Sequence, residues 1–234
     1  MDTIRIFVGT DSRMGKAETV LEHSIRKHAS QPVEITWMRA GDPGWDDWNI
    51  GREPGNPYSH KGGAWATDFT CFRFAVPEAA GFQGRAIYLD ADMFVRKDIA
   101  ELYNYELKRP WMTVGPRTDV SVIDCSKFNN AWWPKIAEMK PSGQKIGHYV
   151  GLMTKHNFFQ HGLPGKWDCL DGRGFDPNKI CLVHFTNMRT QPWKPWPEVF
   201  KYPPKHPCQE VEREFWALYK EATAARDREG SVSS

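Results

Sequence analysis

The chain has 234 residues and lacks the features that mark several protein classes. It has five cysteines, an odd number without CxxC spacing, which argues against a disulfide framework and a zinc site and favours free thiols in a reducing cytosol. No apolar run approaches the roughly 20 residues of a membrane helix, and the first residues do not resemble a signal peptide. We therefore expect a cytoplasmic protein without a transmembrane segment.

The chain also has almost no excess of charge of either sign. The formal net charge is +2, which gives no electrostatic reason to expect a nucleic-acid partner. The composition excludes collagen, coiled coil and wholesale disorder, and no internal repeat is present. The length is typical of one domain with a full hydrophobic core.

Tryptophan is abundant instead, with 11 residues in the chain. Indoles outside regular elements often line binding clefts, where their flat faces meet sugars or bases. The alternative is that these side chains fill the core from loops, and the sequence leaves both interpretations open. Those in stretches rich in glycine and proline are Trp45, Trp48, Trp65, Trp167, Trp193 and Trp196.

The N-terminal pattern predicts a parallel α/β sheet. A β-branched run at 4–9 indicates a buried strand, helical spacing follows over 17–29, and 33–38 forms a second strand. Further helices are expected at 65–75, ended by Pro77, and at 98–105, 127–139, 147–153 and 209–228, with strands at 85–89, 111–114, 120–123 and 180–185. The loop at 40–63 is long enough to be functional or mobile.

Two carboxylates, Asp90 and Asp92, follow the predicted strand at 85–89 and are separated only by Ala91. Ligands of open α/β sheets bind at the carboxyl ends of strands. Two close carboxylates repel one another unless a cation or proton separates them, and their hard oxygens suit Mg²⁺ or Mn²⁺. The alternative is an exposed acidic turn that caps the next helix.

Two later residues extend this hypothesis. His184 ends an apolar strand and, with the two aspartates, would form a mixed oxygen and nitrogen site that Mn²⁺ tolerates better than Mg²⁺. Lys194, between rigid neighbours in Trp-Lys-Pro-Trp, is a candidate point charge for a phosphate. Taken alone, each is more often structural: a core histidine and a surface lysine.

Taken in order, these segments resemble the retaining glycosyltransferases of family 8, the group that includes glycogenin and bacterial galactosyltransferases of lipopolysaccharide synthesis. The resemblance spans about residues 4–196. The matching pieces are the strand and turn Ile6-Phe7-Val8-Gly9-Thr10-Asp11, the arginine Arg73, the segment Leu89-Asp90-Ala91-Asp92 with Val95-Arg96-Lys97-Asp98-Ile99, and His184-Phe185 followed by Lys194-Pro195-Trp196.

The resemblance implies an α/β fold of the GT-A, Rossmann-like, nucleotide-diphospho-sugar transferase type, with a mostly parallel central sheet flanked by helices. It implies one domain over 1–228, with a nucleotide-binding half at about 1–115, an acceptor-side half at about 116–208 and a C-terminal helix at 209–228. Residues 229–234 would form a flexible tail.

The resemblance also implies the ligands of the site. Asp90, Asp92 and His184 would bind Mn²⁺, or Mg²⁺, on the donor's diphosphate. The donor, a nucleotide-sugar and most simply a UDP-sugar, would contact Gly9, Thr10, Asp11, Arg73, Ala91 and Lys194, with Asp90 shared between donor and metal.

The segment under the donor's anomeric carbon departs from the family pattern. Candidates near the reacting carbon are Asp119, which is alternatively a turn residue, and His148, which is alternatively a surface helix start. The interval between His184 and Lys194 is longer than in the family, so Arg189 competes with Lys194 for the phosphate.

We therefore expect a metal-dependent hexosyltransferase that acts on a saccharide or another hydroxyl-bearing acceptor. The tryptophan-rich loop at 45–65 and the 160s are the expected acceptor contacts. Two alternatives remain: a nucleotide-sugar-binding protein that is non-catalytic or hydrolytic, and a phosphatase of the haloacid dehalogenase type with Asp90 as nucleophile.

Overall fold

The computed structural model describes residues 3–45, 67, 69–115, 117–128 and 146–232. Two compact units alternate along the chain. The first comprises Met1–Ser12, Gln31–Asp90 and Ala100–Pro164, and the second comprises Arg13–Ser30, Ala91–Ile99 and Gly165–Ser234. A single domain over 1–228 stays a prediction.

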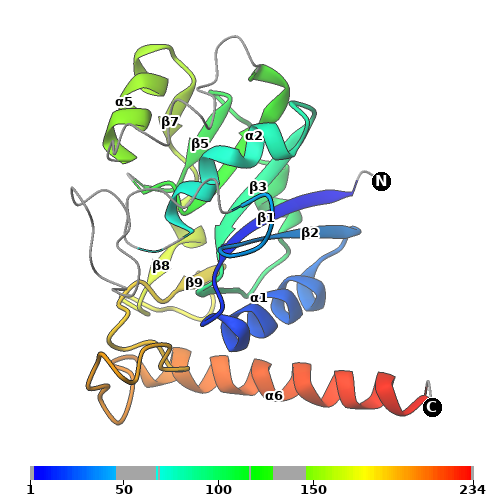
Figure 1. The fold of residues 1–234 in the computed structure, drawn as a ribbon, viewed down its shortest axis with the longest axis vertical. Coiled ribbons are helices and arrows are strands. Elements are labelled where there is room, and N and C mark those ends of the chain that lie inside the picture. The colour runs from blue at the N-terminus through cyan, green and yellow to red at the C-terminus, as the bar shows by residue number, and fades with distance from the viewer. Residues whose placement is uncertain (1–2, 46–66, 68, 116, 129–145, 233–234) are drawn as a thin grey trace. The chain divides into compact units, whose positions relative to one another are not determined.

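The first unit contains a six-stranded sheet in the spatial order β2-β1-β3-β6-β5-β7 (Figure 1). The pairs β1–β2, β1–β3 and β5–β7 are parallel, whereas β3–β6 and β5–β6 are antiparallel. The strands are β1 (Ile4–Thr10), β2 (Val33–Arg39), β3 (Arg85–Asp90), β5 (Trp111–Thr113), β6 (Val120–Asp124) and β7 (Phe159–His161). The predicted mixed α/β architecture is confirmed, with more parallel than antiparallel pairs.

Short helices pack against this sheet: η3 contacts β1 and β3, α3 contacts β3, and α5 contacts β7. They are η3 (Thr70–Ala75), α2 (Val76–Ala79), α3 (Ala100–Tyr103), η4 (Cys125–Lys127) and α5 (Ile146–Lys155). The predicted helix at 65–75 is a 3₁₀ helix over its described part. Pro77 does not end it but lies in the first turn of α2, where its fixed φ is compatible with a helix start.

The second unit contains a three-stranded sheet in the order β4-β9-β8. Strands β4 and β9 are antiparallel, and β8 and β9 are parallel. Its elements are α1 (Gly15–His28), β4 (Met93–Val95), η6 (Gly165–Trp167), β8 (Cys169–Leu170), β9 (Leu182–His184) and α6 (Gln209–Val232). Strand β4 follows the Asp-Ala-Asp segment directly, so Asp92 enters a strand and does not cap a helix.

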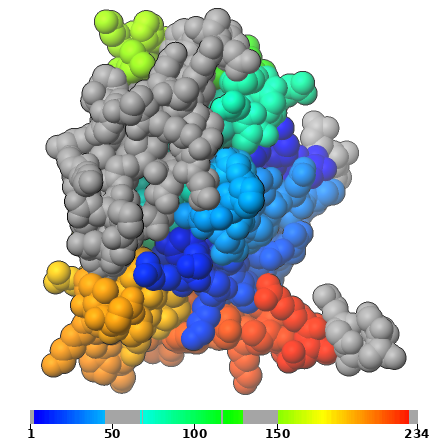
Figure 2. Space-filling view, in the orientation of Figure 1, coloured from blue at the N-terminus to red at the C-terminus, as the bar shows by residue number. Residues whose placement is uncertain are grey.

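Helix α1 packs against β4 on one side and against α6 on another. Its buried side chains recur at helical spacing, including Val20, Leu21 and Ile25. At the surface, Lys27 and His23 both contact the carboxylate of Glu221 on α6, at 2.6 Å and 3.2 Å. Figure 2 shows the C-terminal part of α6, in red, at the surface of the molecule.

The tryptophans of the second unit fill its core. Trp167, Trp193 and Trp196 are buried, and Trp193 stacks on Phe215 of α6 with ring centroids 5.3 Å apart. For these three the core interpretation is confirmed. Trp48 and Trp65 lie outside the described residues. The same holds for most of the expected acceptor loop and for most of the helix expected at 127–139.

Among the described helices, none is both long enough and apolar enough to cross a lipid bilayer.

One glycine of β1 is required by its neighbours. A Cβ atom on Gly9 would lie 2.2 Å from the hydroxyl oxygen of Tyr88 and 3.2 Å from the ring of Phe69, all in the buried interior. We predict that Gly9→Ala lowers the free energy of unfolding by about 1–3 kcal/mol, because overpacking shifts neighbouring side chains. Urea denaturation measures it.

The matched control is Gly151→Ala in α5, where an added Cβ meets no heavy atom within 4 Å. This substitution is expected to leave stability unchanged or raise it slightly, because alanine favours a helix interior. Equal effects of the two substitutions would contradict the packing at Gly9.

Candidate functional site

The carboxyl ends of β1 and β3 meet at one edge of the six-stranded sheet, since Gly9 pairs with Asp90 in parallel register. Thr10 is the last residue of β1 and Asp11 follows it directly, and both are buried. Arg39 at the end of β2 donates from its guanidinium to the backbone carbonyl of Asp11 at 3.4 Å. The residues predicted to hold the nucleotide base therefore lie at the same sheet edge as Asp90.

Asp90 is held by two buried side chains. Nη2 of Arg73, on η3, lies 3.0 Å from each carboxylate oxygen of Asp90, and the hydroxyl of Tyr88 donates to Oδ1 at 2.7 Å. Nη1 of Arg73 donates to Oγ1 of Thr118 at 3.1 Å, which fixes the guanidinium from its other side. Arg73 thus positions the carboxylate of Asp90, as a short buried charge pair requires.

Burial and charge set the protonation of these partners. Burial opposes the charge of Arg73, but the carboxylates of Asp90 and Asp119 and the hydroxyl of Tyr88 more than offset it and raise the pKa of the guanidinium. Burial, followed by the charge of Asp90, raises the pKa of Tyr88 well above its ordinary value. Arg73 stays charged and Tyr88 stays a neutral donor over the whole accessible pH range.

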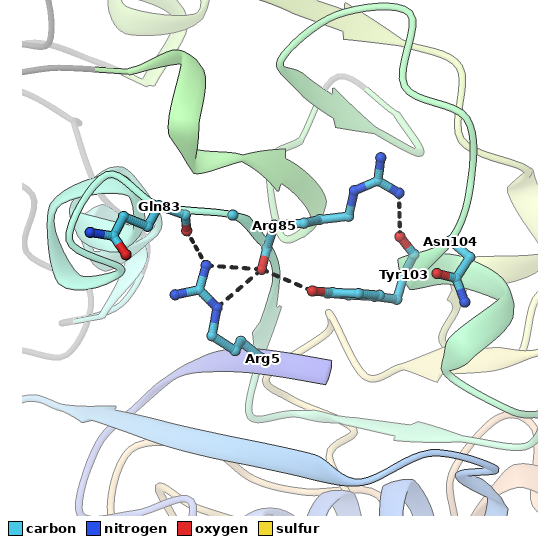
Figure 3. Close-up of a pocket in the computed structure, with 6 residues that line it drawn as sticks. Arg5, Gln83, Arg85, Tyr103 and Asn104 are labelled. Atoms are coloured by element: carbon cyan, nitrogen blue, oxygen red, sulfur yellow. Dashed lines mark hydrogen bonds between the residues drawn. The ribbon is translucent and has the colours of Figure 1, made fainter. Parts of the chain in front are cut away.

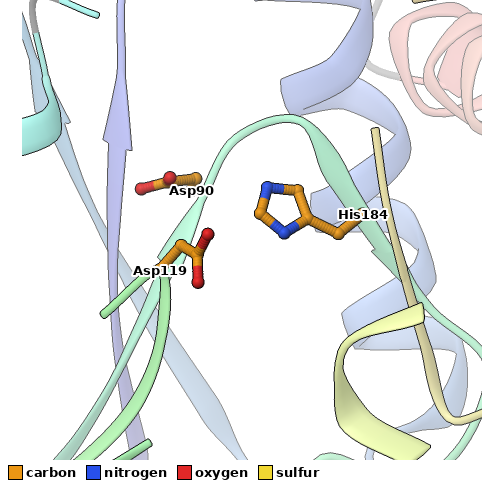
Figure 4. Close-up of side chains that lie close together, drawn as sticks. All are labelled: Asp90, Asp119 and His184. Atoms are coloured by element: carbon orange, nitrogen blue, oxygen red, sulfur yellow. The ribbon is translucent and has the colours of Figure 1, made fainter. Parts of the chain in front are cut away.

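A second carboxylate lies beside Asp90. Asp119 is buried immediately before β6, and ligand oxygens of Asp90 and Asp119 lie within 4.8 Å of one another (Figure 4). Arg117 forms an ion pair with Asp119, with Nε 3.0 Å from Oδ2. Figure 4 also draws His184, which belongs to β9 of the second unit. Two acidic groups this close favour a cation between them.

The second unit positions His184 by an equally specific contact. Nδ1 of its buried imidazole lies 2.9 Å from Oδ1 of Asp168, which follows η6, and Nε2 lies 3.3 Å from Oδ1 of Asp92. In the tautomer assigned from these partners, Nδ1–H donates to the carboxylate of Asp168. The lone pair of Nε2 then faces the space beside Asp92.

Gln191 orients Asp92. Its side-chain amide donates to Oδ2 of Asp92 at 3.1 Å and to the backbone carbonyl of Phe185 at 2.8 Å. Oδ1 of Asp92 is buried and accepts no hydrogen bond from the described residues. A carboxylate oxygen and an imidazole lone pair that face one another repel, unless a proton or a metal ion lies between them. This half of the site therefore fits a cation.

Lys194 occupies a strained position. Its φ is 51°, in the left-handed region, and it is exposed between the buried side chains of Trp193, Pro195 and Trp196. Such a conformation in a residue other than glycine costs about 1–3 kcal/mol and is concentrated at functional sites. Arg189, the alternative phosphate contact, lies with its guanidinium 5.4 Å from the ring centroid of Phe200.

Of the two remaining candidates, Ala91 is described in full and His148 only by its backbone. Ala91 is buried between the two aspartates. His148 lies in α5, but its side chain is outside the described set. Asp168 was predicted from the sequence to be a turn residue or a sugar contact, and its hydrogen bond to His184 was not predicted. Gln191 was not among the candidates, because it belongs to no motif and its contact with Asp92 depends on the fold.

The chain matches no protein-family model. A curated protein of Arabidopsis thaliana, Protein CDI, is 38% identical over 98 residues. The similar region covers 42% of this chain and 35% of the Arabidopsis protein, so it spans about a third of that protein's length.

Solved glycosyltransferase structures are similar to a much larger part of the chain. Glycosyltransferase GlyE of Streptococcus pneumoniae has a TM-score of 0.63 at 13% identity, over 97% of this chain and 64% of its own. The galactosyltransferase LgtC, solved with donor and acceptor sugar analogues, has a TM-score of 0.60 at 12% identity, over 93% and 96%. Mouse xyloside xylosyltransferase 1 has a TM-score of 0.50 at 10% identity, over 80% and 98%.

At these identities the similarity establishes the fold, which is the GT-A glycosyltransferase fold expected from the sequence. Fold alone does not specify activity, so the reaction has to be argued from the site.

The pair formed by Arg73 and Asp90 leads to a stability prediction. Arg73→Met is expected to lower the free energy of unfolding by about 3–5 kcal/mol, because it leaves a buried carboxylate without its counter-charge. The double variant Arg73→Met/Asp90→Asn should recover part of this loss. Urea denaturation of the variants in a double-mutant cycle measures both effects.

The control is Arg26→Met in α1, which removes a guanidinium at the same 3.0 Å from the carboxylate of Glu22, with the two side chains 52% and 29% exposed. Exposed pairs contribute about 0–1 kcal/mol, so this variant should stay close to the parent. A loss below 1 kcal/mol for Arg73→Met would show that Asp90 does not depend on Arg73.

Proposed function

We propose that this protein is a metal-dependent glycosyltransferase that moves a hexose from a nucleotide-sugar, a UDP-sugar, to a hydroxyl group of a saccharide or similar acceptor, with retention of configuration. The observation that carries the proposal is the buried arrangement of Asp92 and His184, whose lone pairs face one another in a chain with a glycosyltransferase fold.

The proposed metal ligands are Asp90, Asp92 and His184, with Mn²⁺ as the ion and Mg²⁺ as its substitute. Asp90 is the last residue of the segment Gln31–Asp90 of the first unit, and Asp92 lies in the segment Ala91–Ile99 of the second, with only Ala91 between them. Chain geometry therefore keeps their Cα atoms within about 7 Å, whatever the arrangement of the units. Two carboxylates and an imidazole form a donor set that suits Mn²⁺.

The donor would lie along the sheet edge. Gly9, Thr10 and Asp11 would contact the base, and Asp90 and Ala91 would lie beside the diphosphate. Lys194, or Arg189 in its place, would contact a phosphate oxygen. A pre-positioned cation there stabilises charge that grows on the leaving group.

In the reaction, the bond between the anomeric carbon and the phosphate oxygen breaks, and its electron pair leaves with the nucleoside diphosphate. The acceptor oxygen forms the new bond to that carbon, and its proton passes to an oxygen of the departing diphosphate. A bound divalent ion would supply Lewis-acid stabilisation of the diphosphate. Arg73 holds Asp90 and Asp168 holds His184 in place for this step. Asp119 and His148 are the proposed groups near the reacting carbon.

The first test is calorimetric titration of UDP with Mn²⁺ and again with EDTA, with GDP as the nucleotide control. We expect micromolar binding of UDP that disappears with EDTA and with Asp92→Asn, because that variant removes a ligand charge. Circular dichroism checks that the variant keeps its fold. UDP binding that survives Asp92→Asn unchanged would overturn the metal assignment.

The same experiment separates the alternatives. Metal-dependent UDP binding with neither transfer nor hydrolysis of UDP-sugars would indicate a non-catalytic nucleotide-sugar-binding protein. Absence of nucleotide binding, together with hydrolysis of phosphate monoesters, would favour the phosphatase interpretation and refute the transferase.

A further prediction concerns Asp168, which contacts the metal only through His184. Asp168→Asn should weaken Mn²⁺ binding about 10- to 100-fold, since the carboxylate fixes the ring orientation and basicity of the imidazole. Titration of Mn²⁺ alone, followed by electron paramagnetic resonance, measures the affinity without turnover. The control is Asp176→Asn, whose carboxylate pairs with Lys179 at the surface. Equal Mn²⁺ affinities in the two variants would assign Asp168 a purely structural role.

A further inference from the structure

A polar cavity lies at the end of the first unit's sheet that is opposite to Asp90. It has a volume of about 500 Å³ and is lined by Arg5, Gln83, Gly84, Arg85, Tyr103 and Asn104 (Figure 3). Arg85 begins β3 and Asp90 ends it. At 3.3 Å per residue the two ends are roughly 16 Å apart, so this cavity is separate from the proposed donor site.

Arg5 is fixed in the wall of the cavity. Its guanidinium donates to the backbone carbonyls of Ala80, Gln83 and Arg85, and the two bonds to Arg85 are each 3.2 Å long. Gly84 leaves the space for it, because a Cβ at this position would lie 3.1 Å from Nη2 of Arg5. The charge of Arg5 is therefore held in one place.

Arg85 offers donors to the cavity. Nη1 donates to the backbone carbonyls of Tyr103 at 2.6 Å and Tyr105 at 3.1 Å, and the guanidinium carbon lies 6.0 Å from the ring centroid of Tyr103. Nε and Nη2 have no hydrogen-bond partner in the part of the chain that the structure describes. Three N–H groups of a fixed guanidinium are thus available to a ligand.

No described residue neutralises the positive charge of the cavity. Across the described residues, neither Arg5 nor Arg85 forms an ion pair with a carboxylate. The cross-strand partner of Arg85 is Asp124, whose carboxylate accepts hydrogen bonds from the backbone and hydroxyl of Ser126 and forms no ion pair with a described arginine. Two cations in one cavity without a counter-charge attract an anion.

We infer that this cavity binds a phosphate group, either inorganic phosphate or the terminal phosphate of a small molecule. A fixed guanidinium with available N–H groups matches the oxygens of a phosphate, and a second fixed cation favours a dianion over a singly charged carboxylate. The side-chain amides of Gln83 and Asn104, which also line the cavity, are further hydrogen-bonding groups. This site is independent of the metal and of the proposed transfer reaction.

The test is titration of the full chain with inorganic phosphate at constant ionic strength in the presence of EDTA, followed by calorimetry. Saturable binding with a dissociation constant below about 1 mM is expected. Asn104→Asp adds a negative charge at the exposed rim and should weaken binding at least 10-fold. Arg85→Gln should abolish it.

Three comparisons define the outcome. Gln209→Glu makes the same change of charge at an exposed position of α6 and should bind phosphate as the parent does. Sulfate should compete with phosphate, whereas acetate at equal concentration should not. A parent chain without saturable binding, unchanged binding in both cavity variants, or equal affinity for acetate would each overturn the inference.

Discussion

The buried ion pair between Arg73 and Asp90 is the constraint on which the candidate site depends. A carboxylate in an apolar interior is costly unless a charge and several hydrogen bonds compensate it. Arg73 and Tyr88 provide both, and each depends on a further residue. Tyr88 occupies space that is available only because residue 9 is glycine, and Arg73 is oriented by its hydrogen bond to Thr118. The packing of β1, β3 and η3 is therefore organised around one charge.

The two units compensate their buried carboxylates differently. In the first unit Asp90 has a permanent counter-charge in Arg73, so its charge is stable without any ligand. In the second unit Gln191 satisfies one oxygen of Asp92, while the other faces His184 without a hydrogen bond. The first arrangement stabilises the fold, whereas the second is repulsive unless a proton or a metal ion lies between Asp92 and His184. The demand for a ligand thus lies mainly with Asp92 and His184.

The sequence predicted those helices and strands that have a clear local pattern of apolar residues. The strands β1 and β3 and the helix α1 followed from β-branched runs and helical spacing, and the predicted architecture is confirmed by the sheet. The three-residue strand β4 gave no periodic signal, because its residues are buried on every side. Asp168 illustrates the limit for the site: its role depends on a contact with His184, 16 residues away, that only the tertiary fold creates.

The six-stranded sheet carries opposite charges at its two ends, and side chains alone account for this. Sheets have only small net dipoles, and the antiparallel pairs of this one reduce its dipole further. At the acidic end, Asp90 and Asp119 already form ion pairs with arginines. Only a cation of higher charge density than a guanidinium would add electrostatic stabilisation there. The basic end, with Arg5 and Arg85, uses backbone carbonyls as its acceptors, and these satisfy hydrogen bonds without neutralising charge. That difference is why an anion at the basic end gains electrostatic energy that no described residue already provides.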